Sequence, residues 1–270
     1  LAVSRACREP TCAPGSSSVA PTNPRRVAKT DDDLFSVHVP LYDPKLSPNS
    51  SEIAKLLWAA QRVPLSIAMC GSFHGCAAIG QCCHANENEQ AAKVLRAAGI
   101  TVLHYVPTMR LPAASSPVCC NSIANITQMV SAALASNGSD GGYFDVVTGL
   151  DEPSELPFFR ALHSLVHNHA PHQPDGRPRP VMLNPSTASF LEEYVKLDGV
   201  RVNGFESTLD RWADANRSRG FDWSRFSRRR FAMVTENAAS IEQMESALHK
   251  AAALNYGVFF VEPAPKPESG

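Results

Sequence analysis

Carboxylate side chains stand directly after short apolar runs at five places in the sequence. They are Asp43, Asp145, Glu206, Glu236 and Glu262. Carboxylates are costly to cluster, because like charges raise each other's pKa. A ring of them is expected where acid/base chemistry or a polyol ligand requires it. The alternative is that each acid only meets solvent at the end of a strand, or caps the helix that follows.

Eight short β-branched or apolar runs predict strands, and five of these strands carry the acids. The predicted strands are Ser36–Tyr42, Leu65–Cys70, Thr101–Pro107, Tyr143–Val147, Pro180–Asn184, Val200–Glu206, Phe231–Thr235 and Tyr256–Val261. Between them, apolar residues at helical spacing predict seven helices. The predicted helices are Ser51–Gln61, Glu87–Ala98, Ile123–Ala135, Glu155–His169, Thr187–Leu197, Thr208–Asn216 and Ile241–Leu254.

This alternation predicts an α/β fold with a mostly parallel sheet, because parallel neighbours need a crossover connection. Eight strands favour closure into a (β/α)₈ barrel of the TIM type, which leaves no sheet edge exposed. An open, doubly wound sheet is the alternative. The 270 residues fit a single barrel of this kind. Active sites of such barrels lie at the carboxyl ends of the strands, which is where the acids stand.

Two segments without apolar periodicity flank the predicted barrel. We expect an N-terminal arm over residues 1–33, the barrel over residues 34–263 and a C-terminal tail over residues 264–270. Few residues follow the eighth strand, so we expect the eighth helix to be missing or replaced, with the arm as one candidate replacement. Cys7 and Cys12 can attach the arm to the barrel through disulfides.

The cysteines and glycosylation sequons point to an oxidising compartment. All eight cysteines fall within the first 120 residues, and Asn-x-Ser/Thr sequons begin at Asn49, Asn125, Asn137 and Asn216. Together they favour a secreted, disulfide-bonded glycoprotein that works at the cell surface or in an extracellular matrix. The pairing of the cysteines stays open, because eight cysteines can pair in many ways.

The charge balance and the cysteine spacing argue against several partners. The formal net charge is -1, from 25 basic and 26 acidic residues, which does not favour nucleic acid or an acidic membrane surface. No apolar stretch approaches the roughly 20 residues of a membrane span. The cluster between Cys70 and His84 contains zinc-ligand residue types, but its spacing does not match a standard zinc pattern and favours disulfides. We therefore predict no metal and no cofactor.

Five segments along the predicted strands carry a family resemblance. They are Val39-Pro40-Leu41-Tyr42, Val102-Leu103-His104-Tyr105-Val106-Pro107-Thr108, Gly142-Tyr143-Phe144-Asp145, Val181-Met182-Leu183-Asn184-Pro185-Ser186-Thr187, and Phe205-Glu206 with Trp212. In this order the chain resembles the spherulation-specific family 4, or spherulin-4-like, proteins over roughly residues 36 to 262. The resemblance implies a glycoside-hydrolase-like barrel that acts on amino-sugar polysaccharides of cell walls, biofilms or cyst coats.

The resemblance also implies roles for two acids. Asp145, at the end of the fourth strand, would be the nucleophile or charge stabiliser, and Glu206, at the end of the sixth, the general acid. Glycosidic cleavage needs two such carboxyl groups flanking the bond. The family usually has Asp-Glu at the fourth strand, whereas this chain has Asp145-Val146. The family's glycine before the third-strand tyrosine is His104 here, and the loop after the second strand is rebuilt with cysteines.

Further residues at the strand ends are predicted to bind substrate. Tyr42, Tyr105 and Trp212 can pack their faces on pyranose rings, with core packing as the alternative. Arg110 can bind an anionic or hydroxyl-rich ligand, or form a surface salt bridge. Asn184 precedes a proline, which forces an extended backbone that can aim its amide at substrate. The predicted set is completed by Asp43, His104, Glu236 and Glu262.

Two classes of function follow from these observations. The first is a secreted, endo-acting glycoside hydrolase whose partner is an extracellular polysaccharide of a cell wall, coat or biofilm. The second is a catalytically inactive spherulin-4-like barrel that binds glycans, or serves as a structural component beside coat or matrix proteins. The Asp145-Val146 departure favours the second class. An unrelated barrel enzyme that shares only the fold is a third reading, since fold does not fix function.

Overall fold

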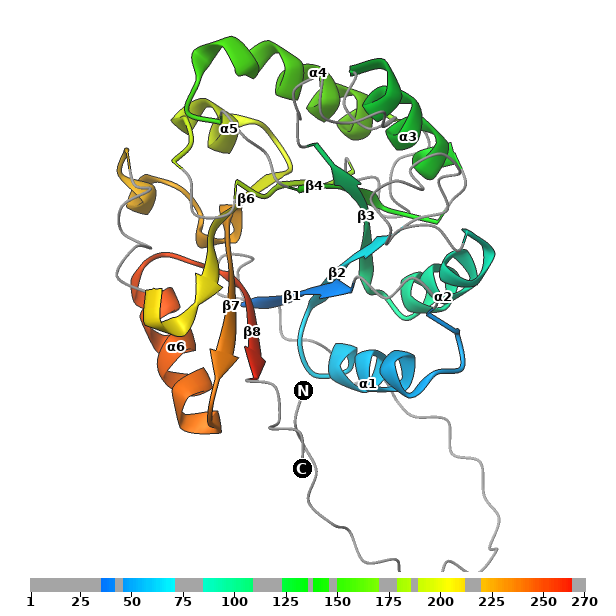
Figure 1. Ribbon diagram of the computed structural model, residues 1–270, viewed down its shortest axis with the longest axis vertical. Coiled ribbons are helices and arrows are strands. Elements are labelled where there is room, and N and C mark those ends of the chain that lie inside the picture. Colours follow the sequence, from blue (N-terminus) through cyan, green and yellow to red (C-terminus); the bar gives the residue numbers. More distant parts are fainter. Residues whose placement is uncertain are drawn as a thin grey trace, which may run out of the picture.

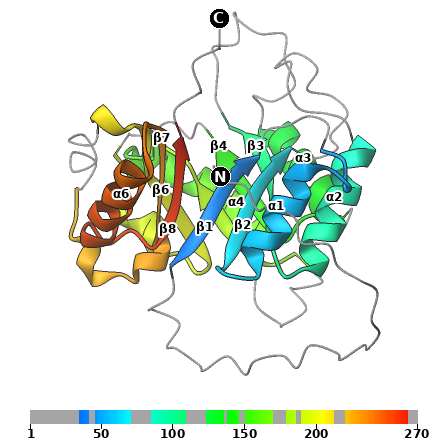
Figure 2. The same ribbon diagram turned by 90° about the horizontal axis from the view of Figure 1, so that it is seen from below.

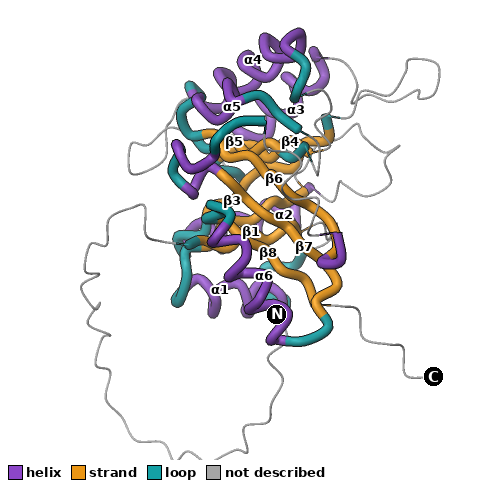
Figure 3. Tube along the Cα trace, turned by 90° about the vertical axis from the view of Figure 1, so that its left-hand side faces the viewer, coloured by secondary structure: helices purple, strands orange, loops and turns teal. Residues whose placement is uncertain are grey.

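Eight parallel strands close into one barrel in the order β1-β2-β3-β4-β5-β6-β7-β8. The computed structural model describes residues 35–41, 46–70, 85–108, 123–135, 138–145, 150–169, 179–185, 189–211 and 220–263. The helices lie outside the wall of strands (Figures 1 and 3). Because β1 pairs with β8, the sheet has no free edge. The predicted (β/α)₈ barrel is confirmed, and the open doubly wound sheet is excluded.

The strands and helices follow the predicted alternation. The strands are β1 (Ser36–Leu41), β2 (Leu65–Cys70), β3 (Thr101–Pro107), β4 (Gly141–Asp145), β5 (Val181–Leu183), β6 (Val200–Thr208), β7 (Phe231–Ala238) and β8 (Val258–Pro263). The helices are α1 (Ser51–Ala60), α2 (Ala85–Ala97), α3 (Ile123–Ala135), α4 (Leu156–His167), α5 (Glu192–Lys196) and α6 (Ile241–Ala253). Short 3₁₀ helices are η3 (Pro153–Glu155), η5 (Trp223–Arg225) and η6 (Arg228–Arg230). No helix in these described segments is long and apolar enough to cross a membrane.

The predicted helix Thr208–Asn216 is wrong at its start. Strand β6 continues to Thr208, which pairs with Glu236 of β7, so this residue belongs to the barrel wall. Residues 212–219 lie outside the described residues. The predicted arm, the tail and the cysteine side chains also lie outside them, so the proposed disulfides are not described.

Serine caps begin the two helices that flank β1 and β8. The Ser50 side chain accepts a hydrogen bond from the backbone N–H of Ile53 at the start of α1. Ser240 accepts one from Gln243 at the start of α6. Each bond satisfies a backbone donor that has no partner within the helix. The local sequence therefore fixes where these two helices begin.

Strand alternation divides the side chains between the barrel interior and the helix layer. The interior cluster takes one residue from each of six strands: Ala68, Leu103, Tyr143, Met182, Ala232 and Val258. Their sequence neighbours point outward, because successive side chains of a strand face opposite sides of the sheet. The outward set packs under the helices in two larger clusters. Which residues reach the axis is therefore decided by parity along each strand.

A β-bulge at Gly204 changes this parity along β6. Asn203 pairs with Ala232 and Phe205 with Met233, so two steps on β6 correspond to one step on β7. Without the extra residue, Phe205 would share the inner face with Asn203, and Glu206 would point toward the helices. The bulge instead buries Phe205 in the outer core and turns Glu206 toward the barrel axis.

Only glycine fits at this bulge. A Cβ added at position 204 would lie 2.3 Å from Cη2 of Trp223. Trp223 is itself fully buried and stacks on Phe231 at a centroid distance of 4.3 Å. The indole therefore cannot move aside without disturbing the aromatic packing around it.

We expect Gly204→Ala to destabilise the fold by about 1–3 kcal/mol, the usual cost of overpacking a core. Urea denaturation of the purified variant measures this loss. Gly220→Ala is the matched control, because a Cβ there would meet no atom within 4 Å. Equal stability of the two variants would show that the Trp223 contact does not constrain the bulge.

Candidate active site

Asn184 links the two carboxylates that the sequence singled out. Its Nδ2 donates a hydrogen bond to Oδ1 of Asp145 at 2.6 Å and another to Oε2 of Glu206. Because one nitrogen reaches both acids, these two oxygens lie within two hydrogen-bond lengths, about 5–6 Å. Asp145 ends β4, Asn184 follows β5, and Glu206 lies on β6. The structure thus brings three sequence-predicted site residues together at the carboxyl ends of adjacent strands.

Backbone hydrogen bonds fix the position of this group. The N–H of Asn184 donates to the carbonyl of Phe144 at 2.8 Å. Both the N–H and the hydroxyl of Thr108 donate to the carbonyl of Asp145, at 2.9 and 2.8 Å. Three strand ends are therefore tied to one another where the carboxylates stand.

Tyr105 holds the second oxygen of Asp145. Its hydroxyl donates to Oδ2 at 2.7 Å, so the two carboxylate oxygens have separate donors. Its ring stacks at 6.0 Å on Tyr143, which in turn stacks at 5.3 Å on His38 inside the barrel. Tyr105, predicted as a sugar platform, thus lies where it orients Asp145 and packs on the interior.

Asn203 supports Asn184 from below. It is fully buried, and its side-chain amide lies 2.9 Å from Oδ1 of Asn184. The Nδ2 of Asn184 faces the two carboxylates. Sequence reasoning missed Asn203. Simple alternation from Glu206 would place Asn203 on the opposite face, and only the bulge between them brings both side chains to the inner face.

The environment of Glu206 favours its protonated form. Burial raises the pKa of its carboxyl, and the nearby charges of Asp145 and Glu236 raise it further. The hydrogen bond from Asn184 acts in the opposite direction. A carboxyl group with a raised pKa suits the role of a general acid near neutral pH.

Two of the other predicted acids are exposed near the ends of their strands. Glu236, on β7, is exposed, and its charge reaches Glu206. Glu262, near the end of β8, is also exposed. Tyr42, Asp43, Arg110 and Trp212 lie outside the described residues. Among the residues that the structure describes, no three His, Cys, Asp or Glu side chains are grouped to hold a metal ion.

His104, predicted to bind substrate, faces the helix layer and points away from the barrel axis. It lies between Leu103 and Tyr105 on β3, and Leu103 belongs to the interior cluster. Alternation therefore turns the imidazole away from the axis. Burial lowers the pKa of His104 to about 4, so the ring is neutral at physiological pH. The residue contributes to packing outside the barrel wall.

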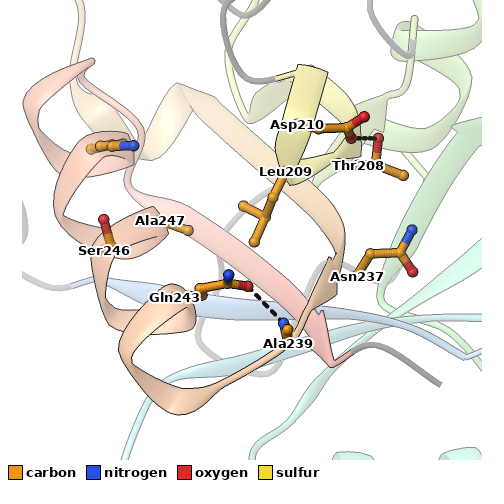
Figure 4. Close-up of a pocket in the computed structure, with 9 residues that line it drawn as sticks. Thr208, Leu209, Asp210, Asn237, Ala239, Gln243, Ser246 and Ala247 are labelled. Carbon is orange, nitrogen blue, oxygen red and sulfur yellow. Dashed lines mark hydrogen bonds between the residues drawn. The ribbon is translucent and has the colours of Figure 1, made fainter. Parts of the chain in front are cut away.

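A pocket of about 630 Å³ with both polar and apolar lining residues lies between the end of β6 and α6 (Figure 4). The hydroxyl of Thr208 donates to Asp210, and Gln243 accepts a hydrogen bond from the N–H of Ala239 at 2.7 Å. Asn237 lines the pocket with a left-handed backbone, φ 64°. Thr208 follows Glu206 by two residues on one strand, about 7 Å along the chain. The pocket therefore shares a strand end with Glu206, although Asp145, Asn184 and Glu206 are not among the residues that line it.

The fold and the site define a (β/α)₈ barrel with a hydrogen-bonded carboxylate pair at its C-terminal face. No known family model matches the sequence, and no curated protein matches it. Among solved structures, Sph3 of Aspergillus clavatus in complex with GalNAc is similar at a TM-score of 0.62 and 15% identity, over 88% of this chain and 92% of that chain. Active domain 2 of a chitinase from Pyrococcus furiosus is similar at a TM-score of 0.48 and 9% identity, over 84% and 83%. At 15% identity, the likeness to Sph3 shows a shared fold.

The raised pKa of Glu206 predicts a pH-dependent effect of Glu206→Gln on stability. The folded protein binds this proton more tightly than the unfolded chain does. The stabilisation is therefore fully present below the ordinary Glu pKa of about 4.3 and is lost as pH rises through the folded value. Glu206→Gln removes this titration. The variant should therefore be more stable than the parent at neutral pH, and the difference in stability should be smaller near pH 4.

Thermal denaturation across this pH range measures the effect. Glu245→Gln, which replaces an exposed glutamate on α6, is the control and should reproduce the pH dependence of the parent. A Glu206→Gln variant that gains stability relative to the parent only at acidic pH would contradict the raised pKa.

Proposed function

We propose that this chain is a glycoside hydrolase that cleaves an extracellular, amino-sugar-containing polysaccharide. The observation that carries the proposal is the amide of Asn184, which holds two carboxyl groups side by side at the C-terminal face of the barrel. Glycosidic cleavage uses such a pair, one acting as acid and one as nucleophile. Sph3, which shares the fold, was solved with GalNAc, and this supports an amino sugar as ligand.

The two acids divide the chemistry between them. In the first step the proton of Glu206 passes to the glycosidic oxygen as the bond to the anomeric carbon breaks. The Asp145 carboxylate then bonds to that carbon. In the second step Glu206 takes a proton from water, the water oxygen attacks the anomeric carbon, and the bond to Asp145 breaks. Both acids return to their starting states.

The separation of the pair favours retention of configuration. Retaining enzymes hold the two carboxyl groups about 5–5.5 Å apart, and inverting enzymes leave about 6.5 Å or more for a water molecule. A single nitrogen bonded to both groups keeps them near the shorter separation. The pocket beside Thr208 would accept further sugar units of the polymer.

The resemblance to spherulin-4-like proteins supports a wall, coat or biofilm polysaccharide as the substrate. The cysteines and sequons support a secreted protein at the cell surface or in a matrix. Cleavage within the polymer, rather than at its ends, is part of this proposal.

One departure favours an alternative, a glycan-binding or structural barrel beside coat or matrix proteins. Val146 stands where the family has a second acid. The next acids, Asp151 and Glu152, are exposed, and Asp151 accepts a hydrogen bond from Ser189 at 3.1 Å. The proposed mechanism therefore relies on Asp145 and Glu206 alone.

We expect the protein to release reducing ends from amino-sugar polymers, and Asp145→Asn and Glu206→Gln each to lower the rate by about 10²–10⁴-fold. A panel of such polymers, assayed for reducing ends, tests this. Glu242→Gln, an exposed change on α6, should leave the rate unchanged. Binding without hydrolysis by the parent protein would favour the alternative. Full activity of Asp145→Asn would remove the assigned mechanism.

The stereochemical outcome gives an independent test. Proton NMR of the first product formed should show the anomeric configuration of the substrate retained. An inverted first product would mean that water occupies a gap between the acids, and that Asp145 does not bond to the sugar.

A further inference from the structure

An apolar groove of about 550 Å³ runs along the outside of the barrel between α1 and α6. Strands β1 and β8 form its floor, and no described helix covers them (Figures 1 and 2). Its lining is mostly apolar and includes Phe35, Leu56, Trp58, Val63, Met244, Leu248 and Phe259. The groove lies on the opposite side of the barrel wall from the interior cluster.

The groove occupies the place of a helix after β8. In a (β/α)₈ barrel each strand is followed by a helix that covers its outer face. Within the described residues no helix follows β8, and the groove over β1 and β8 is bordered by α1 and α6. Residues 264–270 contain Pro265 and Pro267, and proline interrupts helical hydrogen bonding. These seven residues are therefore poorly suited to form a covering helix.

Large apolar side chains stand exposed along the groove. Trp58 is 50% exposed, Phe35 41% and Leu248 38%. Contiguous exposed apolar surface of this kind marks a place where another segment or molecule binds. The groove therefore needs an apolar occupant.

An arginine guanidinium lies over each of the two exposed aromatic rings, Trp58 and Phe35. The guanidinium of Arg62 lies 3.6 Å from the ring centroid of Trp58, and that of Arg228 lies 5.1 Å from the ring of Phe35. Neither arginine forms an ion pair with a residue in the described part of the chain. An occupant that brings carboxylates as well as apolar side chains would complement both groups.

We propose that the segment Val27–Leu34 of this same chain binds the groove and takes the place of an eighth helix. Leu34 is joined directly to Phe35, which lines the groove, so the C-terminal end of the segment adjoins the site that it would fill. Eight extended residues span about 26–29 Å, more than the length of about 15 Å of the ten-residue α1.

The composition of this segment matches the groove. Val27 and Leu34 supply apolar side chains, and Asp31, Asp32 and Asp33 supply three consecutive carboxylates. The carboxylates lie within two to four residues of Phe35, where the guanidinium of Arg228 stands. The sequence thus puts three acidic residues next to Phe35, whose ring contacts the basic side chain of Arg228.

Fluorine NMR of the full chain labelled with 5-fluorotryptophan tests the proposal. A soluble gadolinium chelate broadens the resonances of exposed indoles, and Trp58→Phe assigns the resonance of Trp58. In the parent the chelate should affect Trp58 weakly. In D31K/D32K/D33K and in Leu34→Asp its effect on Trp58 should rise several-fold. Trp223, 1% exposed, should stay unaffected in every sample and serves as the internal reference.

Charge reversal on the groove gives the decisive comparison. R62E/R228E combined with D31K/D32K/D33K should restore the protection of Trp58, which a general loss of folding would not do. Val94→Asp, at a 37% exposed apolar position on α2, is the control and should leave Trp58 protected. Unchanged Trp58 exposure across the arm variants would overturn the proposal, as would protection that disappears on dilution and so comes from a second copy.

Discussion

The hydrogen bond that the Asn184 amide shares between Asp145 and Glu206 is the constraint on which the site depends. Two carboxyl groups this close repel each other when both are charged. The amide donates to both, and Tyr105 donates to the remaining oxygen of Asp145. Glu206, buried and beside a second acid, has its pKa raised. One side chain therefore holds together two carboxyl groups, and the raised pKa of Glu206 suits it to act as a general acid.

The barrel supplies the rigidity behind that amide. Asn203 fixes the orientation of Asn184 from within the barrel, and Thr108 anchors the backbone of Asp145. The bulge at Gly204 turns Glu206 to the same side, and the close contact with Trp223 restricts that position to glycine. Aromatic packing on the outside of β6 is thereby coupled to the aim of the acid on its inside. A site built on strand ends in this way changes little when surrounding loops differ.

The barrel presents two surface features that differ in chemistry. The C-terminal face carries the carboxylate pair, for which we propose a polysaccharide substrate. The apolar groove over β1 and β8 is suited to a protein segment with acidic and apolar residues. Barrel similarity to Sph3 at 15% identity shows how far sequence can diverge while the fold persists. The activity of this chain must therefore be argued from its own site residues.

The sequence by itself determined the alternation of strands and helices and the strand ends at which Asp145 and Glu206 stand. Those signals are local, since periodicity and caps depend on neighbouring residues alone. Tertiary structure decided which face each residue presents. His104 turns outward and Tyr105 inward by parity, while Glu206 reaches the axis only because β6 bulges against β7. The register between two strands depends on pairing and packing across the barrel, which local sequence does not encode. The same change of register puts Asn203 on the inner face with Glu206 and so brings it into the site.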